Sequence, residues 1–235
     1  MEGIPMKESE KMSKEDIKKM NKKVIFVVVM FLLIAIFIWI GLTIQKMTVL
    51  QQIQAKAKEL NAEENVYCKI TFLENDVPDY SSEFFKKGNT IVLKMREGRT
   101  IYKNADTKEA WLINENQKIA GKMIYENVLL DNVPNPGYDY AVGNDEKHIF
   151  QNNLIYSLTS SLVSQKLGDT TCYLWNNMGN KVWYNKDNLL VVKANFGTAE
   201  ENGQKVDVSC QYEYSIGTVT DEQIALPDLT NYTVK

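Results

Sequence analysis

Apolar residues follow three different patterns along this chain, and each pattern predicts a different kind of element. From Val24 to Ile44 they form a run without a charged residue. From Val66 to Leu73, and in many later segments, apolar and polar residues alternate, which is typical of strands with one face in water. Around Ile155, apolar residues recur at the spacing of an amphipathic helix.

The run from Val24 to Ile44 is long enough to cross the roughly 30 Å hydrocarbon core of a membrane as a helix. A core helix of a soluble domain would rarely be apolar on all sides over this length. A cleaved signal peptide has a shorter apolar region that ends in small residues. The segment Gly41–Lys46 offers no such cleavage site, and no cysteine follows the run to carry a lipid. We therefore expect an uncleaved transmembrane anchor at residues 24–44.

Basic residues lie mainly on one side of this run. Residues 1–23 contain the lysines Lys7, Lys11, Lys14, Lys18, Lys19, Lys22 and Lys23. On the other side only Lys46 lies close by, followed by Lys56 and Lys58. By the positive-inside rule, this asymmetry predicts a cytoplasmic basic tail at residues 1–23 and places the domain after the anchor outside the cell membrane.

Residues 45–62 predict a helical stalk. The segment contains good helix formers and no glycine or proline. Its apolar residues, Leu50, Ile53, Ala57 and Leu60, fall at heptad-like spacing. Because fewer than three heptads are present, we expect a single helix leading away from the membrane rather than a dimerising coiled coil.

Residues 63–235 predict one extracytoplasmic domain of the α+β class. Strands are expected first at Val66–Leu73, Ser82–Lys86, Thr90–Arg96, Thr100–Lys103, Glu109–Asn114 and Gln117–Gly121. Helices are expected next at Lys122–Leu130 and Asp145–Lys166. A second run of strands is expected at Thr171–Asn176, Lys181–Asn185, Leu189–Phe196 and Lys205–Gly217. Turn-forming residues separate the strands, which favours an antiparallel sheet packed on two helices. The tail from Asp221 to Leu229 is expected to pack over an edge of that sheet.

The three cysteines, Cys68, Cys172 and Cys210, lack metal-ligand spacing. Cys68 shares a strand face with Val66 and Ile70, and Cys210 with Val208, so both are expected to point inward. Buried cysteines behave as small hydrophobic residues. The extracytoplasmic location also permits disulfides, so core thiols and a Cys172–Cys210 bridge both remain open.

Residues that would carry a reaction are sparse. His148 is the only histidine, which excludes a histidine cluster for zinc, and no nucleophile elbow, metalloprotease motif or phosphate-binding loop accompanies it. We expect a surface or packing role for it. Glu74, Asp76 and Asp79 lack calcium-loop spacing and predict a solvated turn. The mildly acidic composition, with a net charge of −3, gives no basic surface for nucleic acid. We therefore predict no enzyme, no cofactor and no metal.

Aromatic residues on the later strands are the best candidates for a ligand-binding wall. Trp175 shares a strand face with Tyr173, and Tyr212 shares one with Tyr214. Such residues form either ordinary sheet core and cross-strand pairs or the lining of an apolar pocket. The Pro134–Tyr140 loop is rich in proline and tyrosine, and it is interpreted as a partner-contact loop, a lid or an ordinary connector.

The order of strands, two helices and strands resembles the extracytoplasmic lipoprotein-carrier group with the LolA/LppX-like fold. Short phrases of that group also have counterparts here, over residues Glu63 to Tyr232, at Phe84–Asn89, Asn104–Asn114, Trp183–Val191 and Val219–Asp228. The resemblance implies a strongly curved, incomplete barrel that wraps around helices and encloses an apolar cavity. One departure is the helical anchor, since the carrier itself is soluble. A fixed anchor argues against a shuttle.

Two functions follow from these patterns. The first is a membrane-anchored extracytoplasmic binding module that holds an acyl chain or a lipidated protein in an apolar pocket. The second is a non-enzymatic structural or interaction protein, with a filled core, that binds another envelope protein. The abundance of lysine, asparagine and isoleucine suggests a bacterial cell envelope. A continuous apolar cavity would favour the first function and a filled interior the second.

Overall fold

A computed structural model describes residues 14–135, 149–177, 179–201 and 203–235. The chain divides into two compact units, Met1–Gln45 and Lys46–Lys235. The first unit contains most of helix α1 (Lys14–Ala62). Phe31 and Phe37 of this helix are 68% and 71% exposed. Among the described residues, one helix is long and apolar enough to cross a membrane, and it includes the predicted anchor.

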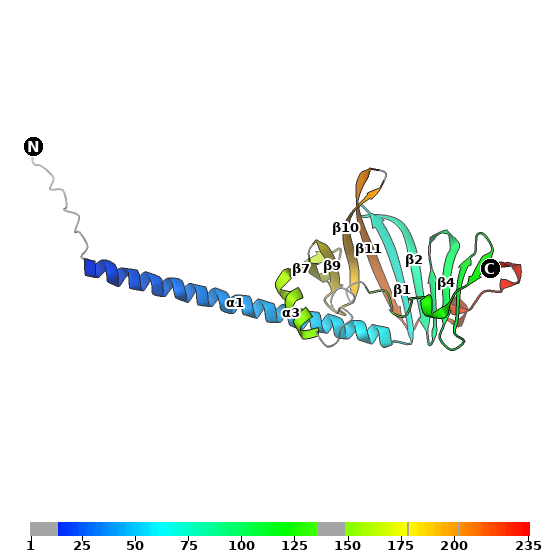
Figure 1. Ribbon diagram of the computed structural model, residues 1–235, viewed down its shortest axis with the longest axis horizontal. Helices are drawn as coiled ribbons and strands as arrows, with labels where there is room; N and C mark the ends of the chain where they lie inside the picture. The colour runs from blue at the N-terminus through cyan, green and yellow to red at the C-terminus, as the bar shows by residue number, and fades with distance from the viewer. Residues whose placement is uncertain (1–13, 136–148, 178, 202) are drawn as a thin grey trace, which may run out of the picture. The chain divides into compact units, whose positions relative to one another are not determined.

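The second unit is built on one curved, unclosed sheet (Figure 1). In the described residues it has 12 strands, in the order β12-β6-β5-β4-β3-β2-β1-β11-β10-β9-β8-β7. The strands before α3 are β1 (Asn65–Glu74), β2 (Val77–Lys87), β3 (Thr90–Lys94), β4 (Arg99–Asn104), β5 (Glu109–Asn114) and β6 (Ile119–Lys122). The later strands are β7 (Ser160–Leu167), β8 (Thr170–Asn177), β9 (Asn180–Asn185), β10 (Val191–Glu201), β11 (Gln204–Ile216) and β12 (Thr233–Val234). The predicted α+β class and curved antiparallel sheet are confirmed.

Alternation along each strand sorts side chains onto two faces of the sheet. In β1, Val66 and Cys68 are fully buried and Ile70 is 9% exposed. We call the face that carries these residues the inner face. Cys68 lies opposite Phe84 of β2 and opposite Tyr214 of β11, so the same face continues across three central strands.

The last part of α1 covers the middle of the inner face. Leu50, Ile53 and Leu60 are 2%, 1% and 1% exposed and belong to the same hydrophobic cluster as Val66 and Phe84. Residues 45–62, for which a single helix was expected, form the end of α1, and their apolar side chains pack in the core. The heptad-like apolar stripe faces this chain's own sheet, because α1 ends at Ala62 and β1 begins at Asn65, so the chain turns back at once.

The outer face is covered by the C-terminal tail. A second cluster contains Phe85, Val92 and Tyr102, and residues of the tail pack on it: Ile224, Leu226, Leu229 and Tyr232. The tail includes α4 (Asp221–Ile224) and the 3₁₀ turn η4 (Leu229–Asn231). It ends as β12, which pairs in parallel with β6. Residues 221–229 were expected to pack over an edge of the sheet, but they pack on its outer face, and only β12 lies at an edge.

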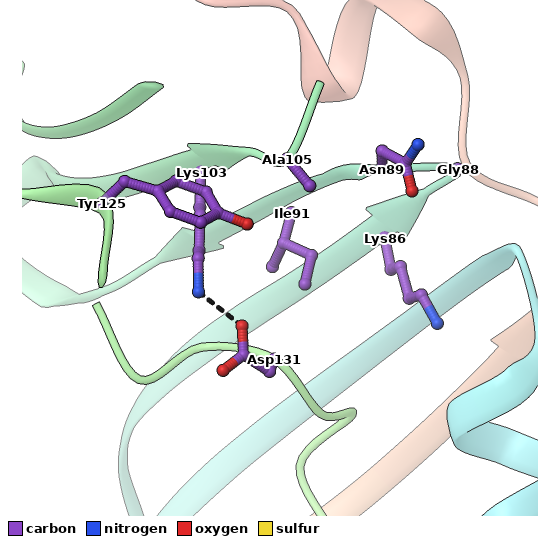
Figure 2. A pocket seen from close by; sticks show the side chains of 8 residues that line it. All are labelled: Lys86, Gly88, Asn89, Ile91, Lys103, Ala105, Tyr125 and Asp131. Carbon is purple, nitrogen blue, oxygen red and sulfur yellow. Dashed lines mark hydrogen bonds and ion pairs between the residues drawn. The ribbon is translucent and has the colours of Figure 1, made fainter. Parts of the chain in front are cut away.

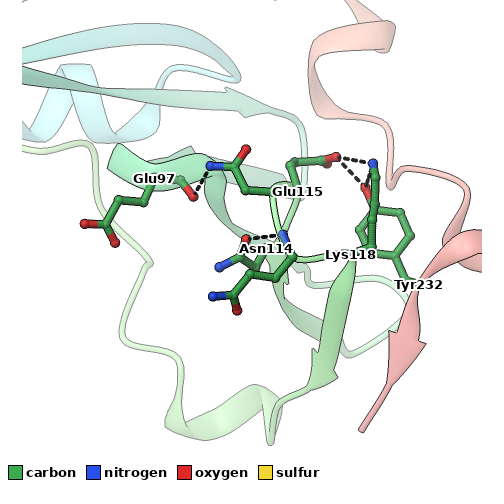
Figure 3. Close-up of polar contacts among 7 residues, drawn as sticks. Glu97, Asn114, Glu115, Lys118 and Tyr232 are labelled. Carbon is green, nitrogen blue, oxygen red and sulfur yellow. Dashed lines mark hydrogen bonds and ion pairs between the residues drawn. The ribbon is translucent and has the colours of Figure 1, made fainter.

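Polar contacts hold the end of the tail on the β5–β6 hairpin (Figure 3). The Tyr232 hydroxyl donates to the carboxylate of Glu115. The Lys118 ammonium lies 3.3 Å from the Tyr232 hydroxyl and 3.4 Å from Glu115. In the same hairpin, the backbone N–H of Gln117 donates to the side chain of Asn114 at 2.9 Å.

The predicted helix at Lys122–Leu130 is wrong. The structure has the end of β6 there, followed by the 3₁₀ turn η2 (Tyr125–Asn127) and an extended segment. The backbone of this segment finds partners outside itself, because Lys103 on β4 donates to the carbonyl of Val128 at 2.6 Å. A short apolar run cannot by itself distinguish a helix from an extended segment that packs on a sheet.

The second predicted helix, Asp145–Lys166, is too long. Residues 145–148 lie outside the described residues. The structure has α3 at Ile149–Thr159, and the chain then continues directly as strand β7. Leu162, at helical spacing from Leu158, lies instead opposite Trp175 of β8. The serines and Val163 of this stretch are weak helix formers, so pairing with β8 decides the local structure.

Candidate ligand-binding site on the inner face

The four aromatic residues predicted from the sequence lie together on the inner face. Trp175 and Tyr212 are 7% and 8% exposed members of the main hydrophobic cluster, and Tyr173 and Tyr214 pack against it. The rings of Tyr212 and Tyr214 stack with centroids 6.4 Å apart. Their proposed role as a ligand-binding wall stays a prediction, because the same cluster includes core residues of α1.

Tyr214 also binds the segment that follows η2. Its hydroxyl donates to the carbonyl of Pro134 at 2.8 Å. Burial raises the pKa of Tyr214 well above its usual range, so this hydroxyl keeps its proton and remains a donor. Within the predicted Pro134–Tyr140 loop, Pro134 and Asn135 are therefore placed against the sheet, and residues 136–140 lie outside the described residues. His148 also lies outside them.

A groove of about 330 Å³ lies on the inner face beside the filled region. Its walls come from strands β1 to β4 and from the 3₁₀ turn η1 (Arg96–Gly98). The lining residues are Ile70, Phe72, Tyr80, Ser82, Leu93, Met95, Arg96 and Arg99. Phe72 and Tyr80 are cross-strand partners, and their rings stack with centroids 4.3 Å apart.

The apolar surface of this groove continues across the neighbouring strands. Leu93 lies opposite Ile101 of β4, and Ile101 lies opposite Leu112 of β5. Residues directly opposite each other in an antiparallel pair share one face of the sheet. Leu112 is 40% exposed. The groove and its extension therefore form a row of apolar side chains that α1 does not cover completely.

Two arginines lie at one end of the groove. The guanidinium of Arg96 lies 5.0 Å from the centre of the Tyr80 ring. The Nε atom of Arg99 is buried and has no hydrogen-bond partner in the described structure, although another nitrogen of the same guanidinium lies 3.4 Å from Glu97. A buried donor without a partner carries a free-energy cost that an added acceptor would relieve.

The backbone at η1 explains how these arginines are placed. Glu97 has a φ of 63° and Gly98 a φ of 69°, which is the left-handed region. A Cβ atom on Gly98 would lie 2.8 Å from the side-chain oxygen of Asn116, so this position requires glycine. Asn116 in turn donates to the carbonyl of Glu97 at 2.9 Å. The tight turn therefore sets Arg96 and Arg99 on either side of it.

A second, polar hollow of about 170 Å³ lies at the other end of β2 and β3 (Figure 2). The Lys103 side chain, 6% exposed, forms an ion pair with Asp131 and lies 4.7 Å from the centre of the Tyr125 ring. Lys86 donates to the carbonyl of Asn61 at 2.6 Å, and burial lowers its pKa. Both ammonium groups therefore bind other parts of the chain, and the hollow serves to attach the segment after β6.

The remaining predicted groups have structural partners. The free thiols of Cys68, Cys172 and Cys210 are all buried, as the core-thiol interpretation expected, and no Cys172–Cys210 bridge is present. Asp76 accepts a hydrogen bond from Lys193 at 2.6 Å. Among the described residues, no group of three or more histidine, cysteine or acidic residues is placed to hold a metal.

The residues that line the groove have only weak signals in the sequence. Strand β2 begins at Val77, whereas the residues around Pro78 had predicted a turn. Tyr80 was therefore excluded from the sheet and not recognised as the partner of Phe72. Arg96 was assigned to the exposed face of a strand, although η1 begins at that residue. The alternation of Ile70 and Phe72 on one strand face was the signal that could have pointed to this site.

No protein-family profile and no curated protein sequence matches the chain. Among solved structures, a DUF1329 family protein from Desulfovibrio piger is 6% identical over 77% of this chain and 97% of that chain, with a TM-score of 0.31. A LolA superfamily protein from Nitrosomonas europaea is 13% identical over 75% and 97%, with a TM-score of 0.28. The MucA/MucB complex of Pseudomonas aeruginosa is 9% identical over 78% of this chain and 63% of that chain, with a TM-score of 0.41. Similarities at this level assign no function.

Proposed function

We propose that residues 46–235 form an extracytoplasmic binding module, tethered to the membrane by the apolar part of α1, whose groove holds an acyl chain with an anionic head group. The observation that carries this proposal is the apolar surface made by the Phe72–Tyr80 pair and by the row Leu93, Ile101 and Leu112, beside which two arginines lie. Burial of methylene groups in such a row would supply about 0.8 kcal/mol each.

The arginines support the choice of ligand. A purely hydrocarbon ligand needs no charged partner, whereas a carboxylate or phosphate can accept two parallel hydrogen bonds from a guanidinium. The unpartnered Nε of Arg99 would gain an acceptor when such a head group enters the groove. The cytoplasmic orientation of the amino terminus, supported by the lysines before Val24, would place the groove outside the cell.

A second candidate function is that of an interaction protein of the envelope, which binds another protein rather than a lipid. The filled middle of the inner face favours it, because Leu50 and Ile53 of α1 already occupy the place where a large cavity would otherwise lie. In that case the groove would accept a side chain or a short apolar segment of a partner.

Photolabelling of the full-length protein in lipid nanodiscs tests the first function. A long-chain fatty acid with a diazirine near its methyl end is added in trace amounts and activated, and labelled peptides are mapped by mass spectrometry. We expect labelling to concentrate on peptides that contain Leu112, since Met95 lies next to the arginines that would bind the head group. Leu112→Asp should decrease this labelling several-fold, since it places a charge in the row. Val77→Asp, at an apolar residue that is 65% exposed outside the groove, is the matched control.

The head-group assignment is tested with a second probe. The corresponding diazirine alcohol has the same chain but no negative charge. The Arg96→Gln and Arg99→Gln variants should bind the acid more weakly and the alcohol equally well. Labelling spread evenly over the domain, or unchanged in Leu112→Asp, would reject the acyl-chain function and favour the interaction protein.

A further inference from the structure

The two edges of the sheet are protected very differently. One edge ends in β12, which is two residues long. The other edge is β7, which has eight residues and pairs with β8 over its whole length without a bulge. Edge strands are usually protected by shortness, charge, proline or bulges. The stretch Ser160–Gln165 contains no charge and no proline, and Lys166 is the only charged residue of β7.

The hairpin turn after β7 determines which of its residues bond to β8 and which direct their backbone groups outward. Gly168 and Asp169 form a two-residue turn between Leu167 and Thr170, which lie opposite each other. The residues that flank such a turn form a hydrogen-bonded pair, and bonded pairs then alternate along the ladder. Val163 therefore bonds to β8, whereas Leu162 and Ser164 direct their backbone N–H and C=O groups away from it. Among the described strands, none pairs with this outer edge.

Helix α3, which leads into β7, has an inverted distribution of side chains. Asn153 and Ser157 are completely buried, whereas Ile155 and Leu158 are 57% and 43% exposed. A helix on the surface of a soluble domain normally turns its apolar stripe inward. The exposed Val163 side chain, at 50%, adds to the same end of the sheet. This end therefore has an open edge and exposed apolar groups together.

We propose that β7 pairs in antiparallel fashion with β7 of a second copy of this chain, about a twofold axis that passes between the two Val163 residues. In this register Leu162 lies opposite Ser164, Ser161 opposite Gln165, and Ser160 opposite Lys166. No like charges meet, and a β-branched pair forms at the centre. If the twofold axis passed between the two Ser164 residues instead, Lys166 would lie opposite Leu162, and the two Val163 residues would no longer face each other.

The Ser160 carbonyl already accepts a hydrogen bond from Lys46 at 2.7 Å, so the proposed pairing uses the remaining outward backbone groups of its span. It would form about six backbone hydrogen bonds. Val163 forms a non-bonded pair with its counterpart, and in such pairs the Cα atoms are about 4.5 Å apart. That distance lies within the range that a disulfide requires, about 4.4–6.8 Å. The register can therefore be read from cross-linking at single positions.

Disulfide cross-linking of the full-length protein in its membrane tests the proposal. We expect Val163→Cys to form a covalent dimer under mild oxidation, seen as a doubled mass on a non-reducing gel. Ser161→Cys is the matched control, because its Cα would lie about 14 Å from that of its counterpart, four residues along the strand. The wild-type protein should stay monomeric on the gel, since its own three thiols are buried.

A second measurement does not depend on oxidation. Val163→Lys would place two ammonium groups opposite each other, so the mass of the full-length protein in mild detergent should change from dimer to monomer. Its circular dichroism spectrum should stay the same, since the side chain is half exposed. The proposal is overturned by equal cross-linking at Ser161 and Val163, by linkage at Ser164→Cys instead of Val163→Cys, or by a wild-type mass of a monomer.

Discussion

Gln54 on α1 and Asn153 on α3 exchange two hydrogen bonds through their side-chain amides, at 2.8 and 3.2 Å. Both residues are buried, at 7% and 0% exposure. Beside them the Lys46 ammonium donates to the carbonyls of Ser157 and Ser160, at 3.0 and 2.7 Å. Hydrogen bonds therefore set the position of α3 on α1, which leaves Ile155 and Leu158 of α3 exposed.

Replacing one member of this amide pair should destabilise the domain. Asn153→Ala leaves the buried Gln54 amide without this partner, and we expect the free energy of unfolding to fall by about 1–3 kcal/mol. The measurement is urea unfolding of residues 46–235, followed by circular dichroism. Gln52→Ala, at an exposed position of the same helix, should change the stability much less. If the two variants are equally stable, the pair does not orient α3.

The core role of α1 predicts a large effect at Ile53. Ile53→Ala removes a side chain that is 1% exposed, and such truncations cost about 2–5 kcal/mol. Ala55→Ser, on the exposed side of the helix, serves as the comparison in the same urea experiment. A stalk that only leads away from the membrane would show no difference between the two variants, so the contrast decides between a core helix and a stalk.

The buried thiols predict a loss of stability at alkaline pH. Burial raises the pKa of Cys68 from 9.0 to about 12 and that of Cys210 from 9.0 to about 11. Above pH 9 the unfolded thiol loses its proton first, so the unfolded state binds fewer protons and the free energy of unfolding falls as pH rises. Below pH 9 these thiols should cause no change.

The thiol contribution can be separated by substitution. A difference of one between the pKa values of a thiol in the folded and unfolded states changes the free energy of unfolding by about 1.4 kcal/mol. We expect Cys68→Ala to be less stable than the wild type at pH 8, yet to lose less further stability between pH 9 and pH 11. Urea unfolding at several pH values provides the comparison. Parallel curves for the two proteins would mean that Cys68 does not titrate differently in the folded and unfolded states.

The contacts of Lys103 attach the segment after β6 to the sheet. Its side chain donates to the Val128 carbonyl. It also pairs with Asp131 (Figure 2). Lys103→Met keeps the length of the side chain but removes both contacts, so hydrogen exchange should accelerate over residues 123–135. Asp131→Asn should have a smaller effect, because this carboxylate is 65% exposed and exposed ion pairs contribute only about 0–1 kcal/mol. Unchanged exchange in Lys103→Met would contradict this attachment.

Local patterns predicted much of the sheet and less of the helical regions. The alternation in β1 and β11 is regular because both strands have one buried face, so their positions followed from the sequence. The segments after β6 and after α3 were misassigned, because Val128 and Leu162 suit either a helix or an extended chain. Their partners, Lys103 and Trp175, are distant in the sequence.

The candidate site depends still more on distant residues. Tyr173, Trp175, Tyr212 and Tyr214 could be selected from the sequence because each pair shares a strand face. The groove, in contrast, joins Phe72, Tyr80 and Arg99, which come together only through the order of β1 to β4. The pairing of Phe72 with Tyr80 has no clear signal in the local sequence, whereas Glu97 and Gly98 did predict the turn before Arg99.

The apolar run, the side of it on which the lysines lie, and the residues of each central strand that share a face all follow from the sequence. These properties depend on composition and on periods of a few residues, so they can be read locally. Three other features come from the packing of distant segments: residues 46–62 fill the core, the groove lies beside them, and β7 is left at an open edge. Each of these depends on which segments meet across long stretches of chain, where the same apolar pattern is compatible with several partners.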